Sequence, residues 1–228
     1  MKILIIEDEK ELAGSIENYL NCEGYLCECV YDYHTADEKI SLYDYDCVVV
    51  DLTLPDGNGL DLVQKLKNGR TDAGIIIVSA KNSTPDKIQG LNMGADDYLS
   101  KPFHLSELNA RLKSVIRRRH FGGQKEFRYH GIRIFPDSRT VFVEENPVEL
   151  TRKEYDLLSY LVMNKNRVLT KEAIVEHLWG DYMGIEADTF DVLYTHVRKL
   201  RKKLQEQGAA DYIETIYAVG YKFVLKED

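Results

Sequence analysis

Short apolar runs alternate with amphipathic stretches through the first half of the sequence. The runs consist mainly of β-branched and aliphatic residues, which is typical of strands buried on both faces of a parallel sheet. The segments predicted as strands are 2–6, 25–30, 46–51, 74–78 and 98–99. The helices predicted between and after them span 12–20, 35–42, 60–68, a stretch that ends at 94, and 105–119. This alternation predicts a doubly wound α/β fold, a five-stranded parallel sheet of order 2-1-3-4-5 with helices on both faces.

The pattern of apolar and polar residues changes after residue 125, where the apolar runs become shorter. Four strands are predicted at 127–129, 132–135, 140–143 and 148–150. Three helices follow, the first opened by a capping box of Thr151 and Glu154. The second runs from Thr170 to about Trp179, and the third spans 187–207. A closing hairpin is predicted from 212–216 and 221–225, so the second module is α+β.

The stretch 117–125 separates the two patterns, because it holds charge and two glycines but almost no apolar residue. We therefore expect a first domain at 1–119, a linker at 120–125 and a second domain at 126–228. Of the whole 228-residue chain, 44% is hydrophobic and 30% charged, as in soluble globular proteins. No apolar run approaches the roughly 20 residues that span a bilayer. The sequence also begins with a strand followed by acids, so we expect a cytoplasmic protein with no membrane partner.

Charge and cysteine content narrow the choice of function only a little. The net charge is −8, of which residues 1–119 contribute −6, so neither half is basic overall. Any nucleic-acid site must therefore come from a local cluster of cations. The four cysteines form no CxxC pair and have no histidine at zinc-finger spacing, which favours free thiols over a metal site.

Acidic residues follow two strands that a doubly wound sheet places side by side. Asp51 ends the third strand, and Pro55 and Gly57 then force a loop. Glu7 and Asp8 follow the first strand. A lone Asp51 would most simply cap the next helix, but ligands of such sheets bind at the carboxyl ends of the strands. Three crowded carboxylates repel one another unless a hard cation joins them, which indicates Mg²⁺.

Two further strand ends supply a hydroxyl, Ser79, and a cation, Lys101. An acidic cluster, a hydroxyl and a lysine are the groups that an aspartyl phosphate needs, with Asp51 as the nucleophile. A haloacid-dehalogenase-type phosphatase is a rival, but it needs an Asp where Thr53 stands. A dinucleotide-binding fold would carry GxGxxG in place of the acids after the first strand.

Residues 1–119 resemble a CheY-like receiver domain in the segments IIEDE, VVVDLTLPDGNG, VSAK and ADDYLSKPF. The resemblance implies that Asp51 accepts a phosphoryl group from a sensor histidine kinase. It implies that Glu7, Asp8, Asp51 and the Thr53 backbone carbonyl hold Mg²⁺, and that Ser79 and Tyr98 form the switch pair. Lys101 matches the lysine of the family, with a cis bond to Pro102. A receiver is not an enzyme in the ordinary sense, since it catalyses only its own phosphoryl transfer and dephosphorylation.

The predicted helix 187–207 carries a cluster of cations beside an apolar stripe. Leu193, Val197, Leu200 and Leu204 are expected to face inward. His196, Lys199 and Lys203 are expected on one exposed face, flanked by Arg198, Arg201 and Lys202. A solvated charged helix face remains an alternative. The concentration of positive charge on a long helix that follows a helix–turn–helix arrangement favours DNA binding.

Residues 125–228 resemble the winged-helix domain of OmpR/PhoB-type response regulators. The resemblance makes 187–207 the recognition helix and 212–225 the wing, with Thr215 and Tyr217 at the DNA. Two positions depart from the family pattern: Tyr194 replaces the usual Asp, and Tyr217 stands where some relatives have Arg. The loop 181–186 aligns with the segment that contacts RNA polymerase in relatives.

The resemblance also implies a homodimer of activated receivers held by salt bridges. The residues that match this face are Lys87, Asp96, Asp97, Glu107, Arg111 and Arg118. Surface ion pairs are each worth only about 0–1 kcal/mol, so we expect weak dimers that are sensitive to salt. The expected function is a two-component response regulator that binds promoter DNA when Asp51 is phosphorylated. The alternative is a DNA-binding regulator that works without phosphorylation.

Overall fold

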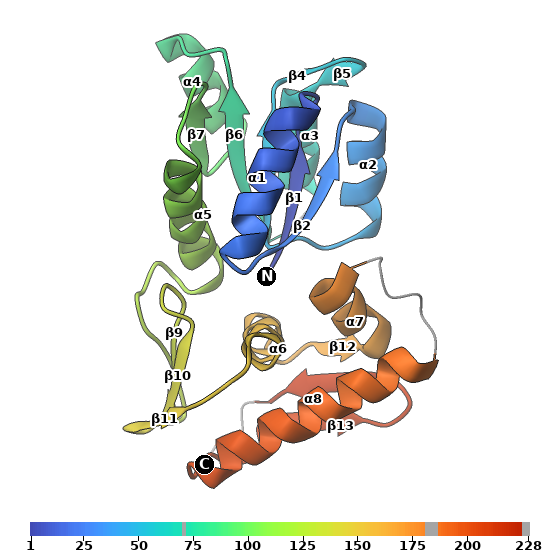
Figure 1. The fold of residues 1–228 in the computed structure, drawn as a ribbon, viewed down its shortest axis with the longest axis vertical. Helices are drawn as coiled ribbons and strands as arrows, with labels where there is room; N and C mark the ends of the chain where they lie inside the picture. Colours follow the sequence, from blue (N-terminus) through green and yellow to red (C-terminus); the bar gives the residue numbers. More distant parts are fainter. Residues whose placement is uncertain (70–71, 181–186, 225–228) are drawn as a thin grey trace. The chain divides into compact units, whose positions relative to one another are not determined.

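The computed structural model describes residues 1–69, 72–180 and 187–224. It divides into two compact units, Met1–Gly123 and Gln124–Asp228 (Figure 1). The helix that closes the first unit continues to His120, so the first residue of the expected linker is helical. Among the described residues, no helix combines the length and the apolar character needed to cross a membrane.

The first unit is built on a parallel five-stranded sheet of order β2-β1-β3-β6-β7. Counted along the chain, this is the predicted order 2-1-3-4-5, because two short strands intervene. Its strands are β1 (Lys2–Ile6), β2 (Leu26–Val30), β3 (Cys47–Asp51), β6 (Gly74–Ser79) and β7 (Asp97–Ser100). Its helices are α1 (Lys10–Cys22), α2 (Tyr33–Leu42), α3 (Gly59–Asn68), α4 (Thr84–Asn92) and α5 (Leu105–His120).

Helices cover both faces of this sheet, α1 and α5 on one and α2, α3 and α4 on the other (Figure 1). Every residue of β1, β3 and β6 is buried, which explains their continuous apolar composition. A hairpin of β4 (Thr53–Leu54) and β5 (Gly57–Asn58) lies in the segment predicted as a loop. Gly59 is required after it, because a Cβ there would lie 2.0 Å from the carbonyl oxygen of Asp51.

The second unit begins with an antiparallel sheet of order β11-β10-β9-β8. Its strands are β8 (Phe127–Tyr129), β9 (Ile132–Phe135), β10 (Thr140–Val143) and β11 (Asn146–Val148). The helices are α6 (Arg152–Met163), α7 (Lys171–Trp179) and α8 (Ala187–Glu206). A second sheet, of order β12-β14-β13, consists of β12 (Val168–Thr170), β13 (Ile213–Ile216) and β14 (Gly220–Phe223). This is the expected α+β winged-helix architecture.

Three local predictions for this unit can be compared with the structure. The capping box is confirmed: the Thr151 side chain accepts from the Glu154 backbone, and the Glu154 carboxylate accepts from the backbone of Thr151. The strand predicted at 148–150 is wrong in position, because β10 pairs with Asn146–Val148. The strand β12 was not predicted from the sequence, and Leu225, expected in the hairpin, lies outside the described residues.

The predicted apolar stripe of α8 is confirmed. Leu193, Val197, Leu200 and Leu204 are buried, and they join residues of α6, α7 and β14 in one hydrophobic core. Burial of such side chains contributes about 1.5–3 kcal/mol each, so the stripe fixes the rotation of α8 about its axis. The rotation in turn decides which of its cations face solvent.

Candidate functional site

Three carboxylates meet at the carboxyl ends of β1 and β3. These strands are direct neighbours, with Ile6 opposite Val50 in the register, so the residues that follow them share one sheet edge. Glu7 and Asp51 are buried and Asp8 is exposed. One oxygen of each lies within 4.8 Å of the others. An oxygen-only donor set with an open side suits Mg²⁺, which binds few protein ligands and keeps several waters.

Lys101 lies between two of these carboxylates. Its Nζ is 2.6 Å from Oδ2 of Asp51 and 2.7 Å from Oε1 of Glu7. Burial alone would lower the pKa of Lys101, but the hydrogen bonds to Asp51 and Glu7 raise it above its ordinary value. The ammonium therefore stays charged and offsets part of the repulsion among the acids. The Lys101–Pro102 bond is cis, as the family resemblance implied.

Burial governs the protonation of Glu7. The pKa of its carboxyl is raised by burial, against the opposing effect of the hydrogen bond from Lys101. Any cation that enters the site stabilises the charged form of a buried carboxylate that lies beside a second one. This electrostatic need is a second observation, besides the donor set, that fits a divalent cation.

The loop after Asp51 is held at both ends. The Thr53 backbone N–H donates to Oδ1 of Asp51 at 3.0 Å, which orients the carboxylate. Farther along, the Asp56 carboxylate accepts from the backbone N–H groups of Tyr33 (2.6 Å) and His34 (3.0 Å) at the start of α2. These bonds lower the pKa of Asp56, the bond from Tyr33 most. This role of Asp56 was not predicted from the sequence, since only the tertiary arrangement brings Asp56 to α2.

Ser79 and Tyr98 lie close to one another on β6 and β7. Ser79 is fully buried, and its Oγ accepts from the backbone N–H of Lys81 at 3.2 Å. Tyr98 is only 8% exposed, and its hydroxyl donates to the carbonyl of Lys81 at 2.5 Å. Burial raises the pKa of Tyr98, whereas its hydrogen bond with Ser79 acts to lower it. The aromatic side chain is thus turned inward, toward the hydroxyl.

The residues expected at a dimer face lie on α4, on β7 or just before it, and on α5, and they largely pair within the chain. Arg111 contacts Asp97 and Glu107, each at 2.9 Å. Arg118 donates to the backbone carbonyl of Asp96 at 3.1 Å. Lys87 is half-buried on α4. Two large apolar side chains of α4, Ile88 and Leu91, are 53% and 45% exposed between these charges.

The residues of α8 that were predicted to contact DNA fall into two groups, those engaged within the domain and those that are exposed. Lys203 does not share an open face with Lys199, because its Nζ lies 2.7 Å from the Glu154 carboxylate. Arg201 donates to the Ile213 carbonyl and, at 2.9 Å, to Oγ1 of Thr215, so it fastens the wing to α8. His196 is half-buried, with its ring against Trp179.

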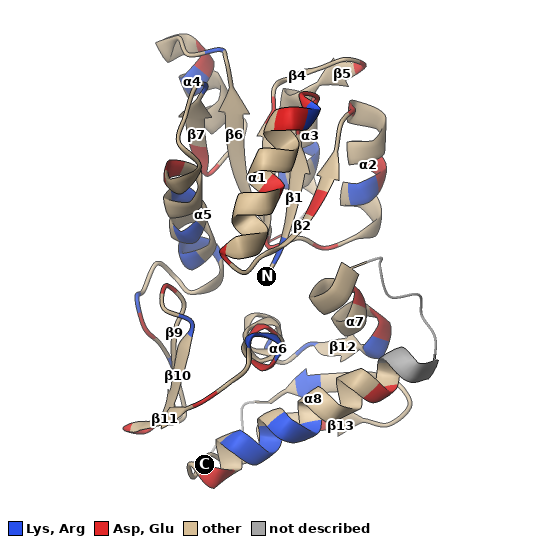
Figure 2. Cartoon of the chain, in the orientation of Figure 1, with Lys and Arg blue, Asp and Glu red and all other residues tan. Residues whose placement is uncertain are grey.

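The second group of cations is exposed: Arg198, Lys199 and Lys202. Figure 2 shows Lys and Arg gathered along the C-terminal half of α8, although the chain as a whole is acidic. Lys202 has a loose partner, Glu206, at 3.6 Å. Of the α8 cations predicted to contact DNA, these three are the ones that remain available for a polyanion.

The wing ends in an exposed aromatic residue. Tyr217 is 94% exposed at the turn between β13 and β14, and Ala218 beside it has a positive φ of 59°. Thr215, also expected at the DNA, is bonded to Arg201. The expected polymerase-contacting loop, 181–186, lies outside the described residues.

Comparison with known proteins gives matches for both halves of the chain. The family model for the response regulator receiver domain matches residues 3–113, and that for the C-terminal domain of transcriptional regulatory proteins matches 145–223. The response regulator ArlR of Staphylococcus saprophyticus is 41% identical over 96% of this chain and 97% of its own length. ArlR of Staphylococcus aureus strain Mu50 is 40% identical over 96% and 98%. A solved Francisella receiver domain of response regulator 1452 is 34% identical, with a TM-score of 0.50, over 51% of this chain and 97% of its own.

Proposed function

This chain belongs to the two-component response regulators that join a receiver to an OmpR/PhoB-type DNA-binding domain, and we propose that phosphorylation of Asp51 switches it. The observation that carries the proposal is the position of Asp51, with one carboxylate oxygen on Lys101 at 2.6 Å and the other on the Thr53 backbone. Domain limits of 1–119 and 126–228 with a linker at 120–125 belong to the same proposal.

The residues around Asp51 are suited to phosphoryl transfer. An oxygen of Asp51 attacks the phosphorus of a phosphohistidine on the sensor kinase. The phosphorus–nitrogen bond breaks, and its electron pair returns to the imidazole. Lys101 then stabilises charge on the transferred group. Hydrolysis of the acyl phosphate restores the carboxylate, so the chemistry is confined to the protein's own aspartate.

Glu7, Asp8, Asp51 and the Thr53 carbonyl would hold Mg²⁺. When bound, the ion neutralises phosphoryl oxygens during transfer. Glu7 and Asp8 serve to place it beside Asp51, because their strand ends are adjacent. Ser79 supplies a hydroxyl that can donate to the new phosphoryl group, and the buried Tyr98 interacts with that hydroxyl.

The partners follow from the two domains. We infer a sensor histidine kinase as the phosphoryl donor and double-stranded promoter DNA as the target of α8 and the wing. The face formed by α4, β7 and α5 would join two activated receivers, with Ile88 and Leu91 adding apolar contact to the charges. Contact with RNA polymerase is part of the same proposal.

A labelling experiment tests the phosphorylation site. The full chain is incubated with phosphoramidate and Mg²⁺, and intact mass is measured. One phosphoryl group should be added to the wild type and none to Asp51→Asn or to the wild type in excess EDTA. The matched control is Asp61→Asn, an exposed acid in the first turn of α3, which should be labelled like the wild type. Labelling that survives Asp51→Asn would show that another residue is the acceptor.

A further inference from the structure

We propose that Lys171, Tyr194 and Arg198 form a seat for one backbone phosphate of duplex DNA, on the flank of α8 that faces the wing. The inference rests on the DNA-binding function of the second domain and adds a contact that neither the exposed centre of α8 nor the tip of the wing provides.

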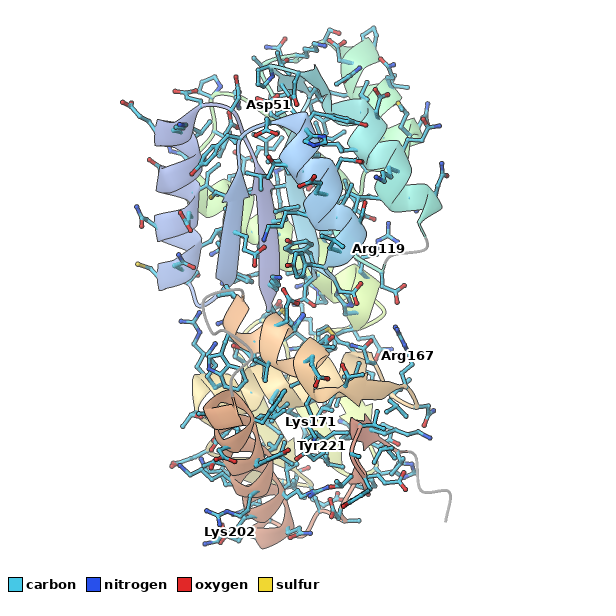
Figure 3. All side chains as sticks on the ribbon, turned by 90° about the vertical axis from the view of Figure 1, so that its right-hand side faces the viewer. Asp51, Arg119, Arg167, Lys171, Lys202 and Tyr221 are labelled. Atoms are coloured by element: carbon cyan, nitrogen blue, oxygen red, sulfur yellow. The ribbon has the colours of Figure 1, made fainter. Side chains whose placement is uncertain are left out.

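The seat borders a depression between α8 and the wing hairpin. Its volume is about 340 Å³, and its walls include Tyr194, Arg198 and Lys202 of α8 and Tyr221 of β14. Figure 3 labels Lys171, Tyr221 and Lys202, which mark this side of the domain. Tyr194 is 39% exposed, so its ring borders solvent instead of filling the core.

Lys171 fixes the position of the Tyr194 ring from a different helix. Its Nζ lies 5.2 Å from the centre of that ring and 5.9 Å from the centre of the Phe190 ring. A hydrogen bond with Tyr194 is the main cause that raises the pKa of Lys171. Because an ammonium has three donors, Lys171 can hold the tyrosine and still offer a donor to an anion.

The charges around the depression do not cancel. Asp211 is one of the residues that line it, but the Arg201 guanidinium is 3.4 Å away and balances its charge. Within the part of the chain that the structure describes, Arg198 has no ion-pair partner, and Lys171 has none either. Lys171 contacts the Tyr194 ring from α7, and Tyr194 and Arg198 line the same depression from α8, so two unbalanced cations flank one tyrosine.

A backbone phosphate of duplex DNA fits this chemistry best. Phosphate oxygens accept from ammonium, guanidinium and hydroxyl donors, and the attached sugar can pack on an aromatic ring. When a recognition helix occupies the major groove, phosphates border both of its flanks. An Asp at position 194 would repel such a phosphate, whereas Tyr194 is neutral and can donate to it.

Binding of a mixed-sequence duplex of about 30 base pairs tests the seat, since phosphate contacts do not depend on sequence. The affinity of the full-length protein is measured by fluorescence anisotropy between about 50 and 200 mM KCl. Lys171→Gln should weaken binding roughly tenfold and lower the slope of log K against log salt by about one unit. Tyr194→Phe should weaken binding roughly threefold and leave the slope unchanged, because only a neutral donor is lost.

Two further variants make the outcome decisive. Lys171→Arg should keep the salt slope of the wild type. Lys165→Gln removes a matched exposed cation, 5.6 Å from the Phe127 ring, and should change neither affinity nor slope. If the wild type binds DNA but Lys171→Gln has an unchanged slope, the seat is wrong while DNA binding stands. If the wild type binds no duplex at the lowest salt, both the seat and the DNA-binding function are wrong.

Discussion

Lys203 of α8 places its ammonium 2.7 Å from the carboxylate of Glu154 in α6, although 49 residues separate them in the sequence. Glu154 also closes the capping box of α6 through the Thr151 backbone. The Glu154 side chain is 2% exposed, and the side chain of Lys203 is 33% exposed. Helix α8 is thus tied to the start of α6, and the Lys203 ammonium stabilises the fold of the domain.

Replacing Glu154 should therefore destabilise the second domain. Glu154→Gln removes a charged acceptor from the Thr151 backbone and from Lys203, and we expect the free energy of unfolding to fall by about 1–3 kcal/mol. The control is Glu206→Gln, which breaks only the exposed pair with Lys202. This substitution should change the free energy of unfolding by less than about 0.5 kcal/mol. Urea unfolding of the full chain, followed through Trp179 in this domain, measures both. Equal effects of the two substitutions would contradict the structural role of Glu154.

The same pair predicts a dependence on pH. Burial acts to raise the pKa of Glu154, but the hydrogen bonds from Lys203 and Thr151 outweigh it and the pKa is lowered. A lowered pKa in the folded state adds stability above the unfolded value of about 4.3, and this stability is lost as the pH falls through the folded pKa. The difference between the wild type and Glu154→Gln should therefore be largest near neutral pH and shrink below about pH 4.

The second prediction concerns Lys101, which lies among the carboxylates of the candidate site. Lys101→Met removes the ammonium that competes with a divalent cation for Glu7 and Asp51. We expect Mg²⁺ to bind roughly tenfold more tightly to the variant, because a nearby positive charge has gone, while labelling of Asp51 becomes slower. Isothermal titration with MgCl₂ measures the first effect, and intact mass over time measures the second.

The control for this experiment is Lys67→Met, an exposed lysine near the C-terminal end of α3, away from the carboxylates. It should leave both the Mg²⁺ affinity and the labelling rate unchanged. Weaker Mg²⁺ binding by Lys101→Met would mean that Lys101 holds the carboxylates in place for the metal and does not compete with it.

Much of this candidate site could be predicted from the sequence, because its residues follow strands. Once β1 and β3 were identified as buried parallel strands, Glu7, Asp8 and Asp51 had to meet at one sheet edge. Asp56 could not be assigned in the same way. Its partners, the backbone N–H groups of Tyr33 and His34, carry no side-chain signal, and they meet it only when the β4–β5 hairpin packs against α2.

The cations of α8 show a second limit of sequence reasoning. Helical spacing identified the buried stripe. Which side chains on either side of it remain exposed depends on the elements that pack against α8. Lys203 lies toward α6 and Arg201 toward the wing, so neither projects freely. β12 was missed for a related reason: three residues, Val168–Thr170, form a strand only because β14 offers them partners.

The third prediction concerns assembly through the face of α4, β7 and α5. We expect phosphorylation to raise the mass seen in sedimentation and Arg111→Ala to reduce that increase, because Arg111 fixes Asp97 and Glu107 on the proposed interface. The monomer should lose less than about 1 kcal/mol of stability, since the pairs are partly exposed. Lys113→Ala is the matched control: it lies on the same helix, has the same 36% side-chain exposure and pairs with Glu23. Equal loss of dimer in both variants would place the interface elsewhere.

The last prediction distinguishes the cations of α8 by what their loss does to DNA binding. Lys199 is exposed and lies away from both the wing and the capping box, so we expect it to contact a base edge in the major groove. Lys199→Ala should cost about 1–3 kcal/mol on the operator and relax specificity at one position. Lys202→Ala should instead weaken all sequences alike and lower the salt slope by about one unit.

Arg201 provides the contrast to both, because its guanidinium is already engaged by Thr215, Asp211 and the backbone of β13. Arg201→Ala should release the wing and so lower both the DNA affinity and the melting temperature. Lys199→Ala should lower the DNA affinity but leave the melting temperature unchanged. An operator selected from random duplexes, together with its single-base variants, allows the affinities to be compared at several salt concentrations. If Lys199→Ala weakens every variant by the same factor, Lys199 contacts a phosphate and the base contact must come from another residue of α8.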